Sequence, residues 1–458
     1  MTVAGELARW SGGLRFEDVP EAVRRAAARQ LLDGVGTALA ARRLGAVDAG
    51  LALATGLGGP PEAAPLGARS RLSAPMAAFA NGLLVHGLDF DDTHADGLVH
   101  ATAVVLPAAF AVGSQLGATG RDVLTACVAG YETVSRVGAA SPYGFHARGL
   151  HATQVAGVFS AAVVAARLAG LGTDTTTHAL GIAGSSAGGL LEFLAAGATT
   201  KQLHPGSASM SGVMAARLAA LGATGPATVF EGSRGLYAAL SERPADPGAV
   251  VRGLGTTWES LRITTKPYPS CQLMHAALDA ITAALPQATV KADKVVSVTV
   301  DVHPDGSAVV CTPARDKARP RTAYDAKFSL PWTVAALLVD GSVSLDTYTD
   351  ASLDRPEIAE LAARVRTNIV PGAMSAADAP GRVEVRFADG STRAAAVPHS
   401  RGGPEAPLSD AELSAKFLGN TGDSGAAREL LDRVLRLEDE PDLAAITELS
   451  ARAAEEHP

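Results

Sequence analysis

The chain has 458 residues, more than the ~250–300 at which a single hydrophobic core usually stops growing, so we expect two domains. Hydrophobic residues make up 47% and charged residues 19% of the chain, which excludes a disordered polypeptide. The formal net charge is -8 and no long Lys/Arg run occurs, so neither nucleic acid nor an anionic membrane surface is an expected partner.

Cysteine usage and the N-terminal segment bear on the compartment. Cys127, Cys271 and Cys311 are far apart and form no CxxC motif, so we expect neither a disulfide framework nor a structural zinc or iron–sulfur site. Residues 1–15 lack a basic region followed by an apolar run, so no signal peptide is expected. The most apolar stretches contain polar residues, which favours buried helices over membrane spans. We therefore predict a cytoplasmic protein.

Ala-rich segments predict a succession of helices from Pro20 to about residue 260. Apolar residues recur there at three- and four-residue spacing, which is typical of amphipathic helices. Aromatic residues are only 4% of the chain, which favours helices packed closely through small side chains. The clearest helical segments are residues 21–43, 121–139, 151–171 and 207–221.

The pattern changes after Lys266. Residues 295–302 read VVSVTVDV, an alternating run typical of a strand. Residues 382–397 contain the dipeptide Asp389-Gly390, which is a strong hairpin-turn signal between two strands. This part of the chain is therefore predicted to mix strands with helices.

A helical pattern returns near residue 404, where Ser409 and Glu412 have the spacing of a capping box. We predict a fold of the α plus α/β class. A large all-α helical domain would consist of residues 1–264 and 404–458, and a smaller α/β domain would be inserted at residues 265–403.

The densest polar segment is residues 89–107, which reads DFDDTHADGLVHATAVVLP. The helical patterns on either side predict a loop between two helices, with Ser73 as the cap of the upstream one. Such a loop can aim the groups of Asp89, Thr93 and His100 into a cleft while the flanking helices hold them. A solvated loop of turn and cap residues is the alternative interpretation.

Three further segments carry candidate groups. His151 stands before a helix whose dipole would favour the neutral imidazole. Carboxylates, cations and imidazoles together are the set required to remove a proton next to a carboxylate, although each residue alone is more often structural or solvated. No nucleotide-binding or hydrolase motif occurs, so no cofactor is expected. The groups are His146, Arg148 and His151; Lys201 and His204; and Lys266, His275 and Asp279.

These segments, in this order, resemble the MmgE/PrpD family, which includes 2-methylcitrate dehydratases, cis-aconitate decarboxylases and an iminodisuccinate epimerase. The resemblance runs nearly end to end, and the order and spacing of the motifs are more specific than any single one. The motifs are HGLDFDDTH (86–94), His100 with the following VVLP, GLHAT (149–153), TTKQLHPGSA (199–208), GATGPATVFEGSRG (222–235), KPYPSCQLMHAALDA (266–280) and KFSLPWTVAALLVDG (327–341).

The resemblance implies a large helical domain with a smaller α/β lid domain, a homodimer, and an active site in the interdomain cleft without a metal or cofactor. By matching motifs, the site residues are Asp89, Thr93, His100, His151, Lys201 and Lys266. We expect the catalytic residues to be Asp89, His100, His151, Lys201 and Lys266. We expect the substrate-binding residues to be Thr93, His94, Lys201, His204, Lys266, His275 and Trp332.

One position departs from the family pattern. Many members carry a Tyr three residues after the Ser of the Lys-Phe-Ser segment, where this chain has Trp332 after Ser329. The change removes a hydrogen-bond donor and adds bulk, which argues against cis-aconitate as substrate unless Tyr324 substitutes. We predict a lyase that eliminates water, or less favourably carbon dioxide, from a small di- or tricarboxylic acid.

Three alternatives stay open at the level of sequence. An epimerase would remove the same proton and return it on the opposite face. A magnesium-dependent isoprenoid enzyme is suggested by Asp92 and Asp96, although an aromatic content of 4% is low for a carbocation pocket. A non-catalytic dimeric scaffold is disfavoured because all the motif-matched polar residues are present.

Overall fold

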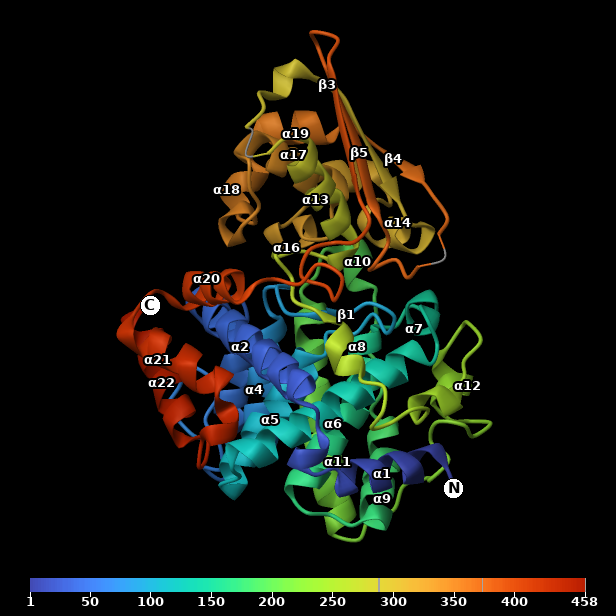
Figure 1. Ribbon diagram of the computed structural model, residues 1–458, viewed down its shortest axis with the longest axis vertical. Helices are drawn as coiled ribbons and strands as arrows, with labels where there is room; N and C mark the ends of the chain where they lie inside the picture. The colour runs from blue at the N-terminus through green and yellow to red at the C-terminus, as the bar shows by residue number, and fades with distance from the viewer. Residues whose placement is uncertain (287–288, 373, 458) are drawn as a thin grey trace. The chain divides into compact units, whose positions relative to one another are not determined.

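The structure is a computed structural model that describes residues 1–286, 289–372 and 374–457. The described residues form two compact units, and Figure 1 labels their elements. The first unit contains residues 1–191, 200–265 and 409–458, and the second contains residues 192–199 and 266–408.

The segment 192–199 was expected in the helical domain but groups with the second unit. Arg321 donates hydrogen bonds to the carbonyl oxygens of Leu194 and Ala195, and the Phe193 ring lies 5.8 Å from that of Phe328. These contacts join segments more than a hundred residues apart, which is why no local sequence signal indicates them.

The first unit is helical apart from one pair of two-residue strands, β1 (Thr93–His94) and β2 (Ile263–Thr264). Its α-helices are α1 (Val3–Gly13), α2 (Glu21–Arg43), α3 (Asp48–Leu57), α4 (Ala74–His86), α5 (Thr102–Leu116), α6 (Gly120–Ala139), α7 (Gly144–Ala147), α8 (Ala152–Leu168), α9 (Thr173–Gly184), α11 (Leu203–Ala220), α12 (Leu236–Leu240), α20 (Asp410–Thr421), α21 (Gly425–Leu435) and α22 (Ala444–Glu456).

Small residues let the central helices α4, α5, α8 and α11 pack closely. A Cβ atom at Gly82 of α4 would lie 2.6 Å from the backbone of Gly206 in α11. A Cβ atom at Gly212 would lie 2.5 Å from that of Ala161 in α8. Contacts this short leave no room for a side chain, so the glycines set the distance between the helices.

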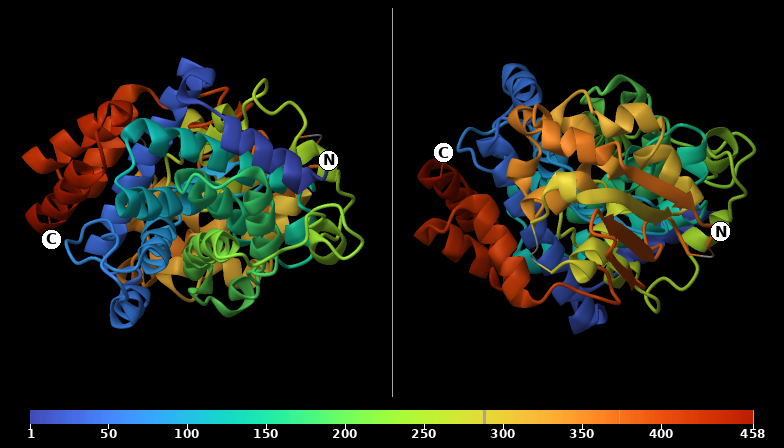
Figure 2. Two further views of the ribbon diagram at one scale, coloured as in Figure 1. Left: turned by 90° about the horizontal axis from the view of Figure 1, so that it is seen from below. Right: turned by 90° about the horizontal axis from the view of Figure 1, so that it is seen from above.

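The C-terminal helices α20, α21 and α22 pack along α2, and Figure 2 shows them together at one side of the helical unit. The capping box predicted at Ser409 is confirmed, since its hydroxyl accepts from the backbone N–H of Glu412 and the Glu412 carboxylate accepts in return. Ser73 occupies the N-cap position of α4 without capping it, because its hydroxyl donates to the Gly58 carbonyl oxygen instead.

The second unit is built on a four-stranded sheet with the order β4–β3–β5–β6. β3 runs parallel to β4 and antiparallel to β5, which pairs with β6 in the predicted hairpin. Its elements are α10 (Phe193–Ala196), α13 (His275–Ala284), β3 (Val295–Val302), α14 (Pro304–Val310), α15 (Ala314–Ala318), α16 (Ala323–Ala326), α17 (Leu330–Asp340), α18 (Asp350–Leu353), α19 (Pro356–Ala362), β4 (Val365–Ile369), β5 (Gly381–Phe387) and β6 (Thr392–Val397).

The core of the second unit lies between its sheet and its helices. α13 and α17 pack against the sheet (Figure 1), and alternate residues of β5 such as Val383 and Val385 are buried. A Cβ atom at Gly381 would lie 2.0 Å from the carbonyl oxygen of Ala276, so glycine is required where β5 begins beside α13. In the described part of the chain, no helix of either unit combines the length and the apolar character needed to cross a membrane.

The glycine contact between α4 and α11 gives a testable prediction. Gly82→Ala should lower the free energy of unfolding by about 1–3 kcal/mol, because the added methyl group would overlap the Gly206 backbone. Gly12→Ala in α1 is the control, since no described atom lies within 4 Å of the position of its Cβ. It should raise stability by about 0.5–1 kcal/mol. Urea unfolding of both variants measures the difference, and equal midpoints would contradict the close packing.

Candidate active site

The acidic loop joins α4 to α5, as predicted, and it is held in place by the C-terminal part of the unit. Asp89 has a φ of 52°, in the left-handed region that Asp adopts more readily than most residues. Lys416 of α20 donates a 2.9 Å hydrogen bond to the Phe90 carbonyl oxygen, and its ammonium lies 3.8 Å from the centre of the Phe90 ring. The same ammonium pairs with Asp33 of α2 at 2.6 Å, so two helices fix the backbone beside Asp89.

Lys201, in the turn before α11, connects two of the predicted residues. Its ammonium donates to Asp89 Oδ1 at 2.5 Å and lies 3.3 Å from His100 Nε2. His100 Nδ1 lies 2.8 Å from the Asp92 carbonyl oxygen and 3.3 Å from Thr93 Oγ1. Because Nδ1 faces a carbonyl and therefore carries the hydrogen, Nε2 presents its lone pair to the ammonium. The structure thus brings Asp89, Thr93, His100 and Lys201 together in a buried cluster.

His151 is the N-cap residue of α8, as the sequence predicted, and it adjoins this cluster. Its ring centre lies 5.7 Å from that of His100, and its Nδ1 lies 3.0 Å from His204 Nδ1. Burial, followed by the charge of Lys201, holds the pKa of His151 well below its ordinary value. Burial is also the main cause that lowers the pKa of His204 to about 4. Both imidazoles are therefore neutral at neutral pH.

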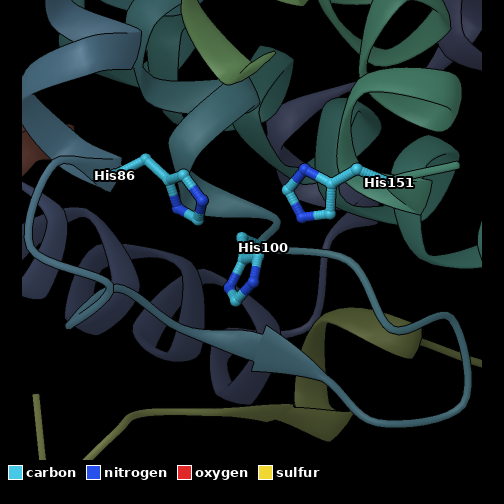
Figure 3. A group of neighbouring side chains, drawn as sticks. All are labelled: His86, His100 and His151. Carbon is cyan, nitrogen blue, oxygen red and sulfur yellow. The ribbon is translucent and has the colours of Figure 1, made fainter. Parts of the chain in front are cut away.

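His86, at the end of α4, belongs to the same cluster, although the sequence placed it only within the HGLDFDDTH motif and not among the expected site residues. Its Nδ1 lies 2.8 and 3.0 Å from the two carboxylate oxygens of Asp91, and both side chains are fully buried. The ring centre of His86 lies 4.6 Å from that of His100 and 5.7 Å from that of His151. Figure 3 shows these three rings pointing toward one another from separate parts of the chain. The signal for the pair was the five-residue spacing of His86 and Asp91 within the acidic motif.

His94 has both ring nitrogens engaged within the protein. Its Nε2 lies 3.0 Å from a carboxylate oxygen of Glu259, and its Nδ1 accepts a hydrogen bond of 3.1 Å from the backbone N–H of Gly97. These bonds hold the loop around β1, which pairs with β2. A substrate-binding role for His94 stays a prediction.

The other predicted residues, Lys266, His275 and Trp332, belong to the second unit. His275 opens α13, and its Nε2 lies 3.1 Å from the Ser270 carbonyl oxygen. Trp332 is buried in the hydrophobic core, with its ring centre 5.8 Å from that of Tyr348. Core packing accounts for Trp332 without a ligand. The substrate-binding roles of Lys266, His275 and Trp332 stay predictions.

The two aspartates that suggested a diphosphate-binding motif are engaged separately. Asp92 accepts a 3.1 Å hydrogen bond from the backbone N–H of Thr102 and another from its hydroxyl, at the start of α5. Asp96 forms a 2.6 Å ion pair with Arg262. The two carboxylates have different partners, which removes the observation that favoured a magnesium-dependent isoprenoid enzyme.

Two groups of buried side chains bring potential metal ligands within 4.8 Å of one another. Among the described residues, the groups are His86, His100 and His151, and His86, Asp89, Asp91 and His100. The sequence expectation of no metal rested on the absence of ligand spacing, and this reason does not hold once the fold joins distant histidines. A different constraint acts here, because the ammonium of Lys201 lies within 3.3 Å of His100 Nε2 and opposes a second cation.

Comparison with known proteins decides the family. Models of the MmgE/PrpD N-terminal and C-terminal domains match residues 5–247 and 268–439. The chain belongs to the MmgE/PrpD family. The family resemblance of the motifs is thereby confirmed, and the chain is an enzyme of the lyase type.

Three known proteins are similar to this chain over most of its length. Cis-aconitate decarboxylase of Aspergillus terreus is 28% identical over 98% of this chain and 95% of its own length. The cis-aconitate decarboxylase-like protein oryM of Aspergillus oryzae is 28% identical over 98% of this chain and 97% of its own length. Cis-aconitate decarboxylase of Homo sapiens is 26% identical over 83% of this chain and 80% of its own length.

Asp92 predicts a pH-dependent loss of stability. Burial is the main cause that raises the pKa of Asp92 to about 7, so between about pH 4 and 7 the folded protein keeps a proton that the unfolded chain releases. The free energy of unfolding therefore falls as the pH rises through this range. Asp92→Asn removes this loss, and the stability of the variant relative to the wild type should improve from pH 5 to pH 8 by roughly 2–3 kcal/mol.

Urea unfolding at the two pH values tests the effect. Asp246→Asn is the control, because Asp246 is exposed and its pKa lies below the ordinary value, mainly through its hydrogen bond with Arg252. The ionisation of Asp246 is complete below pH 5, so Asp246→Asn should change the free energy of unfolding by the same amount at both pH values. If Asp92→Asn behaved in the same way as Asp246→Asn, Asp92 would be ionised throughout.

The ion pair of Lys201 and Asp89 predicts a double-variant effect. Lys201→Met leaves a buried carboxylate without its ammonium, which should cost about 3–5 kcal/mol of stability. Lys201→Met/Asp89→Asn removes both charges and should recover most of that loss, while both variants lack activity. Chemical unfolding together with a turnover assay separates the two effects. A single variant as stable as the wild type would show that the pair is not desolvated.

Proposed function

We propose that the chain is a metal-independent lyase that acts on a small di- or tricarboxylic acid by transferring a proton at the carbon next to a carboxylate. The observation that carries this proposal is the buried ammonium of Lys201, held by Asp89 beside neutral imidazoles. A fixed ammonium in a desolvated site attracts a substrate carboxylate and stabilises the negative charge that develops when the proton leaves. A neutral imidazole is a suitable acceptor for that proton.

Each residue of the cluster has a role in this proposal. Asp89 orients the ammonium of Lys201, which binds the carboxylate next to the reacting carbon. The hydroxyl of Thr93, 3.3 Å from His100 Nδ1, is a hydrogen-bonding group for the substrate. Lys266 keeps its expected role as a second carboxylate-binding residue, on the strength of its motif in the family.

The absence of a metal in the proposed reaction follows from charge. Zinc and similar ions require ligands whose lone pairs are available, and a dication beside an ammonium is opposed by several kcal/mol in a desolvated site. His100 Nε2 faces the ammonium of Lys201 at 3.3 Å, so this lone pair is already engaged. Proton transfer and charge stabilisation are therefore assigned to side chains alone.

Cis-aconitate is the first acid to test, because the relatives from Aspergillus terreus and Homo sapiens are named for its decarboxylation. The sequence argument against this acid assumed that Trp332 faces the substrate. Its packing against Tyr348 in the core of the second unit does not support that assumption. Saturated hydroxy acids such as 2-methylcitrate test the dehydratase reaction.

The test is turnover of a panel of carboxylic acids after exhaustive chelation. We expect one or more of cis-aconitate, citrate and 2-methylcitrate to react at the same rate as before chelation. Proton NMR in deuterated water and the release of carbon dioxide measure the reaction. The protein should contain no stoichiometric metal by elemental analysis. Recovery of a lost activity by one specific metal would contradict the metal-independent proposal. Exchange with inversion and no new alkene would identify an epimerase instead of a lyase.

A further inference from the structure

The cluster of imidazoles contains three candidates for proton transfer, and their hydrogen bonds distinguish them. His100 has both ring nitrogens engaged, one by the Asp92 carbonyl oxygen and the other by the ammonium of Lys201. His86 and His151 each have a buried Nε2 that has no hydrogen-bond partner among the described protein residues. Only these two present a nitrogen of this kind within the three-ring group of Figure 3.

The nitrogen of His86 is defined more closely than that of His151. The two carboxylate oxygens of Asp91 surround Nδ1 of His86, and an ionised carboxylate only accepts hydrogen bonds. Nδ1 must then carry the hydrogen, and Nε2 carries the lone pair. His151 Nδ1 faces another imidazole nitrogen, that of His204, so either ring can be the donor and the tautomer of His151 is not fixed.

A buried hydrogen-bond acceptor without a partner destabilises the folded state. His86 is fully buried, and its Nε2 is left without a partner among the described residues while its Nδ1 contacts the carboxylate of Asp91. Its ring centre is 4.6 Å from that of His100, which contacts Lys201. A ligand bound at Lys201 is therefore the molecule that the lone pair of His86 Nε2 can contact.

We propose that His86 is the base that removes the proton from the substrate carbon next to a carboxylate, and that Asp91 is the positioning residue that fixes its tautomer. The proposal rests on the proposed lyase function and assigns its central step. From the sequence, His100 and His151 were the histidines expected to be catalytic, and His86 was not among them.

The substrate and the residues described account for the proton and the electron pair in this proton transfer. The C–H bond next to the carboxylate breaks, an N–H bond forms at His86 Nε2, and the electron pair passes into the carboxylate as an enolate beside the ammonium of Lys201. When the leaving group is a hydroxyl, the electron pair then forms the carbon–carbon double bond and the C–O bond breaks. The hydroxyl departs as water with a proton from Lys201.

Electrostatics favour His86 over His151 as the acceptor. Burial is the main cause that lowers the pKa of His86, and the carboxylates of Asp91 and Asp89 oppose that effect. For His151, burial lowers the pKa and the neighbouring ammonium of Lys201 lowers it further. An imidazolium formed at His86 is stabilised by the carboxylate of Asp91 on its Nδ1, whereas Nδ1 of His151 faces the imidazole of His204.

The test compares His86→Gln with Asp91→Asn and the control His178→Gln. His178 lies in α9, and its Nδ1 is within 3.1 Å of the Gly225 carbonyl oxygen, outside the cluster. In single-turnover assays with citrate or 2-methylcitrate, the hydroxy acids whose dehydration breaks this C–H bond, His86→Gln should lower the rate of C–H cleavage by ~10²–10⁴-fold with little change in KM. Asp91→Asn should lower it because the amide can place the hydrogen on Nε2. His178→Gln should keep the wild-type rate.

Two further measurements separate a base from a structural residue. The wild-type rate should rise with pH through a single ionisation below about pH 6.5, and this dependence on pH should vanish in His86→Gln. The titratable groups that face the base are Asp91, Asp89, Lys201, His100 and His151. Nitrogen-15 NMR of labelled histidines should show His86 with the hydrogen on Nδ1 in the wild type and on Nε2 in Asp91→Asn. This second readout needs no substrate.

The outcomes are distinct for the base and for the lyase function. If the wild type dehydrates a hydroxy acid while His86→Gln reacts within a few-fold of it, the assignment of His86 is overturned and the lyase function stands. The same holds if the wild type only releases carbon dioxide from cis-aconitate, because that reaction removes no proton from carbon. If the wild type consumes no acid in the panel, the function itself fails, whatever the NMR shows. If His86→Gln lowers the thermal midpoint but its folded fraction turns over normally, His86 is structural and the proposal fails. Loss of a bound stoichiometric metal in His86→Gln would identify a metal ligand and also overturn it.

Discussion

The ion pair between Lys201 and Asp89 is the contact on which the arrangement of the site depends. Two opposite charges in a buried position are stable only when their geometry is fixed and their remaining hydrogen bonds are satisfied. The left-handed backbone of Asp89, the hydrogen bond from Lys416 to the Phe90 carbonyl oxygen and the contact of Lys201 with His100 fix the geometry of this pair. The acidic loop is thus a constrained segment, although its composition is that of an ordinary turn.

One buried ammonium also sets the protonation of its surroundings. The charge of Lys201 adds to burial in lowering the pKa of His86, His151 and His204, so the site combines one cation with several neutral rings. Such a division between a group that attracts anions and groups that accept protons is what proton removal next to a carboxylate requires. Asp92 differs from its neighbours, because its carboxyl group serves the start of α5 and its pKa is raised to about 7, mainly by burial.

Local patterns predicted the features that depend on nearby residues. The helix at residues 21–43, the strand at 295–302 and the N-cap position of His151 follow from periodicity, alternation and capping, and the structure places them as expected. The partnership of Lys201 with Asp89 was predicted only as shared membership of a site, since 112 residues separate them. The family resemblance supplied that information, because periodicity does not carry it.

Other features could not be read from the sequence. The unpartnered nitrogen of His86 depends on the ring geometry of three segments, and the grouping of residues 192–199 with the second unit depends on Arg321. For Trp332, the motif position predicted a substrate contact, and what the structure adds is that its side chain packs in the core of the second unit. A motif fixes the identity of a residue, whereas the direction of its side chain follows from packing.

The ion pair of Lys416 with Asp33 has a consequence for synthesis of the chain on the ribosome. α2 is translated well before its partner helices α20, α21 and α22. Until these helices have been synthesised, the side of α2 that they contact stays uncovered, and the acidic loop lacks the ammonium of Lys416 that fixes its backbone. A polypeptide truncated before Asp410 therefore lacks a contact that the site needs.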